Sequence, residues 1–195
     1  RYVQSVLGLY WTLINPLVTA GILTAVFSVV VRVPVEDIPY FLLVLAGLLG
    51  WNLFANAVGD ATQSLVVHAN LLGKVPFPRE VLPAASVAAR VVDFAASALV
   101  LLALTLLFSP RGLGATLLWL PVVLLVQLLF TLGASLVCAM ANVFYRDVRQ
   151  LVGLLLMLGF YVTPVLYPLA LVPERFRVFY LANPMAAVVD SYRRT

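Results

Sequence analysis

Charged and amide side chains occur at helical spacing inside two long apolar stretches of this sequence. Asn52, Asn56 and Asp60 are four residues apart and share one helix face, with Gln63 one turn further on. Such groups are costly in hydrocarbon unless they face a partner or water. This polar stripe therefore predicts a face turned to a polar pathway or a subunit interface, with ordinary interhelical hydrogen bonding as the alternative.

The next apolar stretch carries Arg90 and Asp93, which are one helical turn apart and can pair. If the two stretches form antiparallel helices, Asp60 and Arg90 lie at similar depth, and Arg90 is the expected nearest cation of Asp60. We interpret this arrangement as structural rather than catalytic.

The sequence contains no catalytic or phosphate-binding signature. It has no HExxH, no GxSxG and no glycine-rich phosphate loop, and its one histidine, His68, has no second histidine or cysteine near it. We therefore predict a protein that is not an enzyme by itself, with no metal site and no cofactor of its own.

Composition indicates an all-α integral membrane protein. Of the 195 residues, 64% are hydrophobic and 10% are charged, with a mean hydropathy of +1.08. A soluble domain carries about 25% charged residues. A net charge of +4, scattered between apolar runs, argues against nucleic-acid binding. The lone Cys138 lies in an apolar run and excludes an intrachain disulfide.

Because a helical span needs about 20 residues, the apolar runs predict a polytopic helical bundle with five visible spans, of which the fifth is short for a bilayer. Residues 1–11 predict an interfacial helix, with the frayed start of the first span as the alternative. Gly133, Ala134 and Ser135 form a small-residue patch suited to close helix packing. The predicted spans cover residues 13–31, 40–67, 82–108, 115–141 and 151–162.

Two polar elbows separate these spans. The first, residues 68–83, is broken by three prolines, but residues 69–73 can still form one helical turn. The second covers residues 142–150. Placing both elbows in the cytoplasm satisfies the positive-inside rule, whereas the arginines near the carboxyl end, Arg193 and Arg194 among them, run against it.

The stretch 163–190 is too polar to span and too apolar to be a free linker. Pro164 and Pro168 break the helix there, so we expect short re-entrant helices. Aromatic side chains offer platforms for a polar substrate or, equally, anchors at the membrane interface. These candidates are Trp51, Phe160, Tyr161, Tyr167 and Tyr180.

Several stretches, in order and spread over nearly the whole chain, resemble the ABC-2 type permeases. Most similar are the subunits that export O-antigen, capsular polysaccharide or teichoic acid. The stretches are RYVQSVLGLYW (residues 1–11) with Asn15-Pro16-Leu17, NLLGKVPFPREVLP (70–83), YRDV (145–148), TPVLYP (163–168) and Asn183-Pro184-Met185.

The resemblance implies a homodimeric permease of the bacterial inner membrane that exports a lipid-linked polysaccharide. Two separate cytoplasmic ATPase subunits would hold the ATP and Mg. It implies that the first elbow is the coupling helix, formed by Asn70, Leu71, Leu72, Lys74 and Arg79, and that residues 163–190 form an outward-side gate. Leu71 and Leu72 would enter a groove on the ATPase or, alternatively, rest on lipid.

The family has six spans, so we expect residues 1–195 to be a single permease domain that lacks its last span and belongs to a longer chain. The alternative functions are an ABC-2 exporter of a small molecule or drug, and an ATPase-free membrane scaffold or channel.

Overall fold

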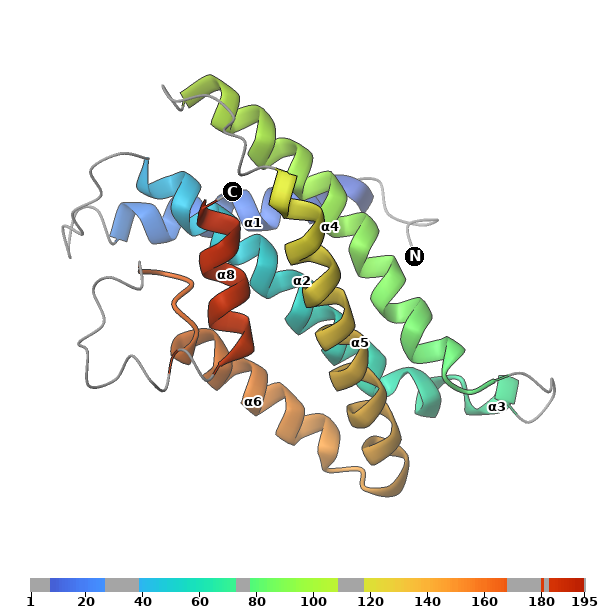
Figure 1. The fold of residues 1–195 in the computed structure, drawn as a ribbon. Helices are drawn as coiled ribbons and strands as arrows, with labels where there is room; N and C mark the ends of the chain where they lie inside the picture. The colour runs from blue at the N-terminus through green and yellow to red at the C-terminus, as the bar shows by residue number, and fades with distance from the viewer. Residues whose placement is uncertain are drawn as a thin grey trace.

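The structure is a computed structural model that describes residues 8–26, 39–72, 78–108, 118–167, 180 and 183–194. The described residues are helical apart from short turns (Figure 1). The helices are α1 (Gly8–Val26), α2 (Tyr40–Val67), α3 (Ala69–Leu72), α4 (Val81–Phe108), α5 (Leu120–Phe144), α6 (Val148–Val162) and α8 (Pro184–Arg194).

Helix α2 is the centre of the bundle and contacts α1, α4, α5, α6 and α8. It starts directly after Pro39, whose carbonyl accepts from the Leu42 N–H at 2.8 Å, and it ends at His68. In its most apolar part 67% of the residues are buried, against 11% for α4 and 22% for α5. α2 is therefore the core helix, and α4 and α5 turn much of their apolar surface outward.

Side-chain bonds fix the directions of the neighbouring helices. Asp60 of α2 meets Arg90 of α4, near the first elbow in both helices, so α2 and α4 are antiparallel. Gln127 of α5 bonds Gly50 and Asn142 bonds Thr62, so α5 runs parallel to α2. The end of α2, the start of α4 and the end of α5 therefore lie together, and we call this the elbow end (Figure 1).

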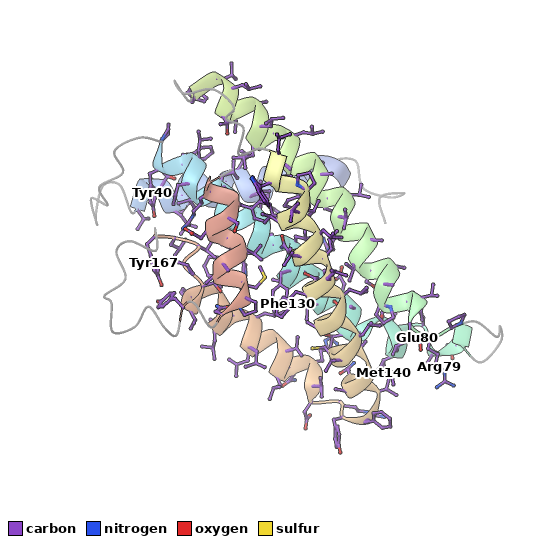
Figure 2. All side chains as sticks on the ribbon, in the orientation of Figure 1. Tyr40, Arg79, Glu80, Phe130, Met140 and Tyr167 are labelled. Atoms are coloured by element: carbon purple, nitrogen blue, oxygen red, sulfur yellow. The ribbon has the colours of Figure 1, made fainter. Side chains whose placement is uncertain are left out.

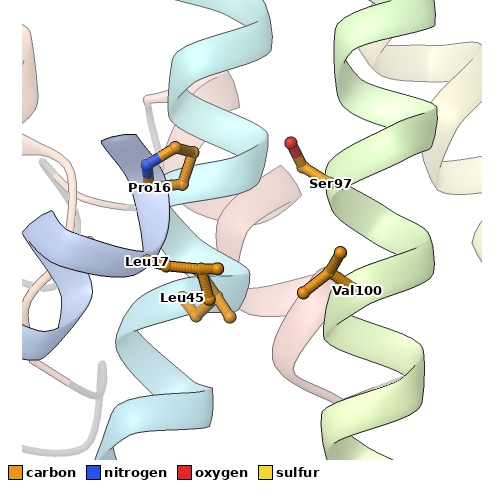
Figure 3. A pocket seen from close by; sticks show the side chains of 5 residues that line it. All are labelled: Pro16, Leu17, Leu45, Ser97 and Val100. Carbon is orange, nitrogen blue, oxygen red and sulfur yellow. The ribbon is translucent and has the colours of Figure 1, made fainter. Parts of the chain in front are cut away.

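Helix α1 packs against α2 and α4 and runs through Pro16 without a break. Residues 8–11 of the predicted interfacial helix continue into the first apolar run as one helix, and residues 1–7 lie outside the described part. A narrow gap remains where the three helices meet, lined by Pro16, Leu17, Leu45, Ser97 and Val100 (Figure 3). It is too narrow to hold a water molecule, so it is a packing defect beside the proline ring.

The prediction of an all-helical membrane protein with several apolar helices is confirmed. Three described helices, α2, α4 and α5, are long and apolar enough to cross a bilayer, and residues 14–26 and α6 are shorter apolar helices. Helix α6 ends at Val162 because Thr163 adopts an extended backbone before Pro164. The count of five spans and the re-entrant form of residues 163–190 stay predictions. α8 continues past Asp190 to Arg194, so residue 190 is not an element boundary.

Candidate functional site: elbows, ion triad and far-end anchor

The first elbow contains the short helix that its sequence predicted. Helix α3 spans Ala69–Leu72, directly after the turn at His68. The Asn70 side chain is exposed, as are Arg79 and Glu80 at the other end of the elbow (Figure 2). The side chains of Leu71 and Leu72, and all of Lys74, lie outside the described residues. The elbow thus offers a polar surface at the end of the bundle.

The second elbow is shorter than predicted, since α5 extends to Phe144 and α6 begins at Val148. The prediction of residues 142–150 was wrong at both ends. Asn142 is buried inside α5 and donates to the Thr62 carbonyl oxygen at 2.9 Å, so it belongs to the helix packing. Only residues 145–147 form the turn, in which Tyr145, Arg146 and Asp147 are exposed.

Arg90 joins two carboxylates in an arrangement that we call the ion triad, made of Asp60, Arg90 and Asp93. The Arg90 Nε and Nη2 atoms both lie 2.8 Å from Asp60 Oδ2, and Nη1 lies 3.0 Å from Asp93 Oδ2. The expected pairing of Asp60 with Arg90 is confirmed. Because one cation faces two carboxylates, the triad is formally negative, and it ties α2 to α4 on the elbow side of the bundle.

The rest of the polar stripe is less covered. Asn52 and Gln63 are half-buried, and Asn56 is exposed on the surface of the protomer. Exposure of an amide on a bilayer-crossing helix is costly if lipid covers it. Asn56 is therefore open to contact with lipid, water or a second protein chain on this face of α2.

A second polar row lies on α5, and the sequence analysis did not predict it. The side chains of Gln127, Thr131, Ser135 and Asn142 are buried on the face that packs on α2. Gln127 donates to the Gly50 carbonyl oxygen at 2.6 Å and accepts from the Tyr192 hydroxyl at 2.6 Å. The sequence signal for this row was the spacing of its polar residues, which stand four positions apart at 127, 131 and 135 and so share one helix face.

Of the predicted small-residue patch on α5, only one residue faces α2. Only Ser135 of that patch is buried, whereas Gly133 is exposed, and a side-chain carbon there would meet nothing within 4 Å. Close approaches to α2 occur instead at Gly47, beside residues 165 and 193, at Gly50, beside the Tyr192 ring, and at Trp51, beside Gly159.

The five aromatic candidates fall into two groups. Trp51 is only 6% exposed and packs on Phe160 with ring centroids 6.1 Å apart, so its ring is covered and acts as a core residue. Phe160 contacts Tyr161, which is 60% exposed. The hydroxyls of Tyr167 and Tyr180 are 2.6 Å apart. Burial and this hydrogen bond raise the pKa of Tyr167, so its phenol stays neutral.

Residues 163–167 are fastened to α2 and α8 by side chains, at the end of the bundle opposite the elbows (Figure 2). Asn183 Nδ2 donates to Thr163 Oγ1 at 3.0 Å, and the Tyr40 hydroxyl donates to the Leu166 carbonyl oxygen. Pro164 is buried here, and Pro168 lies outside the described residues. We call this set the far-end anchor: Tyr40, Gly47, residues 163–167, Asn183 and Arg193.

Arg193 supplies the other bonds of the far-end anchor. Its guanidinium donates to the carbonyl oxygens of Val165 at 2.6 Å, Tyr167 at 2.9 Å and Leu43 at 3.3 Å. The sequence analysis counted Arg193 among the tail charges that oppose the positive-inside rule. It is instead half-buried in the bundle, so it is not a loop charge of the kind that the rule counts.

Comparison with known proteins agrees with this architecture. The ABC-2 type transporter family matches residues 1–195. An O-antigen export system permease protein RfbA of Klebsiella pneumoniae is 33% identical over 193 residues, and one of Myxococcus xanthus is 37% identical over 195. Both alignments cover 99% of this chain and 74% of the relative. Because the family model matches residues 1–195 and the fold is a helical membrane bundle, this chain belongs to the ABC-2 type transporter family.

Proposed function

We propose that this chain is the transmembrane subunit of an ABC exporter that moves a lipid-linked polysaccharide of the O-antigen type across the bacterial inner membrane. The observation that carries the proposal is the similarity to O-antigen export permeases over 99% of the chain. The chain itself performs no chemistry and holds no cofactor. Separate ATPase subunits bind ATP and Mg and supply the energy.

Coupling to the ATPase takes place at the first elbow, through Asn70, Leu71, Leu72, Lys74 and Arg79. The position of α3 at the end of the bundle, with exposed polar residues on both sides, supports this role (Figure 2). Lys74 and Arg79 attract acidic groups on the partner and so raise the association rate more than the affinity.

The ion triad carries motion from that elbow into the membrane. The first elbow connects the end of α2 to the start of α4, and the triad joins the same two helices further into the bundle. A push on α3 therefore moves α2 and α4 together instead of separating them. The triad thus transmits motion of the first elbow to α2 and α4 as a unit.

The polar stripe on α2 lines the polysaccharide path or faces the second subunit of a homodimer. Asn56 is exposed in the single protomer, and an amide in this position is stabilised by water, sugar hydroxyls or a second chain. Tyr161 is an exposed aromatic platform on α6. Both features favour a hydrogen-bonding conduit over a compact apolar cavity for a drug-like molecule.

The coupling role is tested by replacing Leu71 and Leu72 together with aspartate in the full-length chain. We expect normal membrane insertion but loss of ATPase co-purification and of polysaccharide export. The matched control is Leu71→Met with Leu72→Met, which keeps both side chains apolar and should retain binding. Normal binding and normal export in the aspartate variant would refute the assignment of α3 as the coupling helix.

A further inference from the structure

The far-end anchor contains a single cation that holds several main-chain groups at once. We propose that Arg193 is a latch that keeps residues 163–167 against α2 in the resting protein and lets them move when the far end of the bundle opens. Opening for a polysaccharide rests on the proposed function, whereas the latch itself does not.

Residues 163–167 need such a partner because they are not helical. The Val165 N–H bonds the Thr163 carbonyl oxygen at 2.7 Å, but the carbonyls of Val165, Leu166 and Tyr167 are bonded by side chains. Irregular backbone at membrane depth is tolerated only where protein or water satisfies it. Arg193 satisfies two of these three carbonyls.

Arginine suits this geometry better than lysine does. The guanidinium presents five N–H donors in a planar fork, and here Nε, Nη1 and Nη2 each bond a different carbonyl. A lysine donates from one nitrogen atom and cannot hold three separated acceptors equally well. Burial lowers the pKa of the Arg193 guanidinium, and Asp190, one turn earlier on α8, partly opposes this by favouring the charged form.

The other side of the latch is Gly47 on α2. A side-chain carbon at position 47 would lie 2.9 Å from the Val165 carbonyl oxygen and 3.1 Å from Arg193 Nη2. The missing side chain therefore lets residues 163–167 and the guanidinium approach α2 together. Adding a methyl group there should force them away from α2 without removing any charge.

Release requires movement of one short helix. Helix α8 carries Arg193, and Asn183, just before its first turn, bonds Thr163. A shift of α8 away from α2 would break the bonds of both residues together. Only the Tyr40 hydroxyl, on α2 itself, would then hold the Leu166 carbonyl. The latch is thus formed by two helices whose separation frees the segment.

Cysteine accessibility tests the latch in the full-length chain assembled with its ATPase. Leu166, only 9% exposed, is replaced with cysteine in a Cys138→Ala background, and a membrane-impermeant maleimide is added on the side opposite the ATPase, without nucleotide or polysaccharide. Arg193→Met and Gly47→Ala should each raise the labelling rate about tenfold, as expected when charge-assisted hydrogen bonds are lost. Arg193→Lys should raise it less.

Two control substitutions on the same helices should leave labelling unchanged. Gly59→Ala adds the same methyl group to α2 where nothing lies within 4 Å, and Ser191→Ala changes an exposed side chain of α8. A cysteine at Ala139, fully buried near the elbow end, should stay unlabelled in Arg193→Met when the same maleimide is added on the ATPase side.

The latch is overturned if Arg193→Met leaves the Leu166→Cys rate unchanged in folded protein. It is equally overturned if the cysteine at position 139 becomes labelled to the same extent, because the variant has then lost packing throughout. Labelling is measured without any transported molecule. A failure of polysaccharide export in a separate assay would therefore refute the proposed function and leave the latch result intact.

Discussion

At the level of single residues, the ion triad places one guanidinium between two carboxylates inside a bundle of apolar helices. Breaking a buried pair is costly because the remaining charge is left without compensation. The two acidic residues are not equivalent, since Asp60 lies on α2 and Asp93 lies on the same helix as Arg90. Only the bond to Asp60 ties two helices together.

Substitutions in the triad should therefore differ in their cost. Arg90→Met removes the cation that bonds both carboxylates, and because the pair is only partly buried we expect the free energy of unfolding to fall by about 3 kcal/mol, the low end for a broken buried pair. Asp60→Asn keeps the pair of Arg90 with Asp93 and should cost about 1–3 kcal/mol. Unfolding of the purified protein in detergent measures both, with Val92→Ala at an exposed site of α4 as control. Equal losses for both variants would contradict the triad geometry.

The two arginines also show which contacts a sequence can predict. The pairing of Asp60 with Arg90 was predictable because both residues lie at similar distances from one elbow. The role of Arg193 was not, since its acceptors are backbone carbonyls 26, 28 and 150 positions away in the chain. Any residue type can supply a carbonyl, so these partners leave no signature in the sequence.

At the level of helices, prolines made some boundaries predictable. Pro39 and Pro78 flank α2 and α4, whose observed limits lie within one residue of the expected spans. The turn between α5 and α6 was predicted too long because a polar residue, Asn142, was assigned to the elbow. In the bundle that amide is satisfied by the Thr62 carbonyl, so α5 continues past it.

Helix α6 offers a matched pair of glycines that tests the packing on α2. A side-chain carbon at Gly159 would lie 2.8 Å from the Trp51 ring, whereas Gly153 has nothing within 4 Å. We expect Gly159→Ala to destabilise the protein by about 1–3 kcal/mol through overpacking. Gly153→Ala should be neutral or stabilising by up to about 1 kcal/mol, since alanine favours a helix. Thermal unfolding compares the two, and the reverse order would contradict the close contact of Gly159 with Trp51.

At the level of the whole molecule, the single protomer leaves large apolar surfaces uncovered. Val92 and Leu99 of α4, Leu129 of α5 and Leu155 of α6 are all more than half exposed. Such surfaces suit lipid or a second copy of the chain, and they contrast with the exposed amide of Asn56 on α2. The face that carries Asn56 is therefore the one expected to meet water or a second subunit.

Labelling and cross-linking of a cysteine at position 56, in a Cys138→Ala background, test that expectation. If the face lines an aqueous path, an impermeant thiol reagent should label it in the assembled exporter. If it meets the second subunit, the two cysteines should cross-link on oxidation. A cysteine at Leu155, on an apolar surface that we expect to face lipid, should show neither reaction. The same inert behaviour at position 56 would mean that Asn56 faces lipid.

Transport by the reconstituted exporter tests the central claim most directly. The full-length permease and its ATPase are placed in proteoliposomes with a lipid-linked polysaccharide and ATP on the ATPase side. We predict ATP-dependent appearance of the polysaccharide in the lumen, and its loss with Leu71→Asp and Leu72→Asp. ATP hydrolysis without movement of the polysaccharide, or with export of a small dye in its place, would contradict the account.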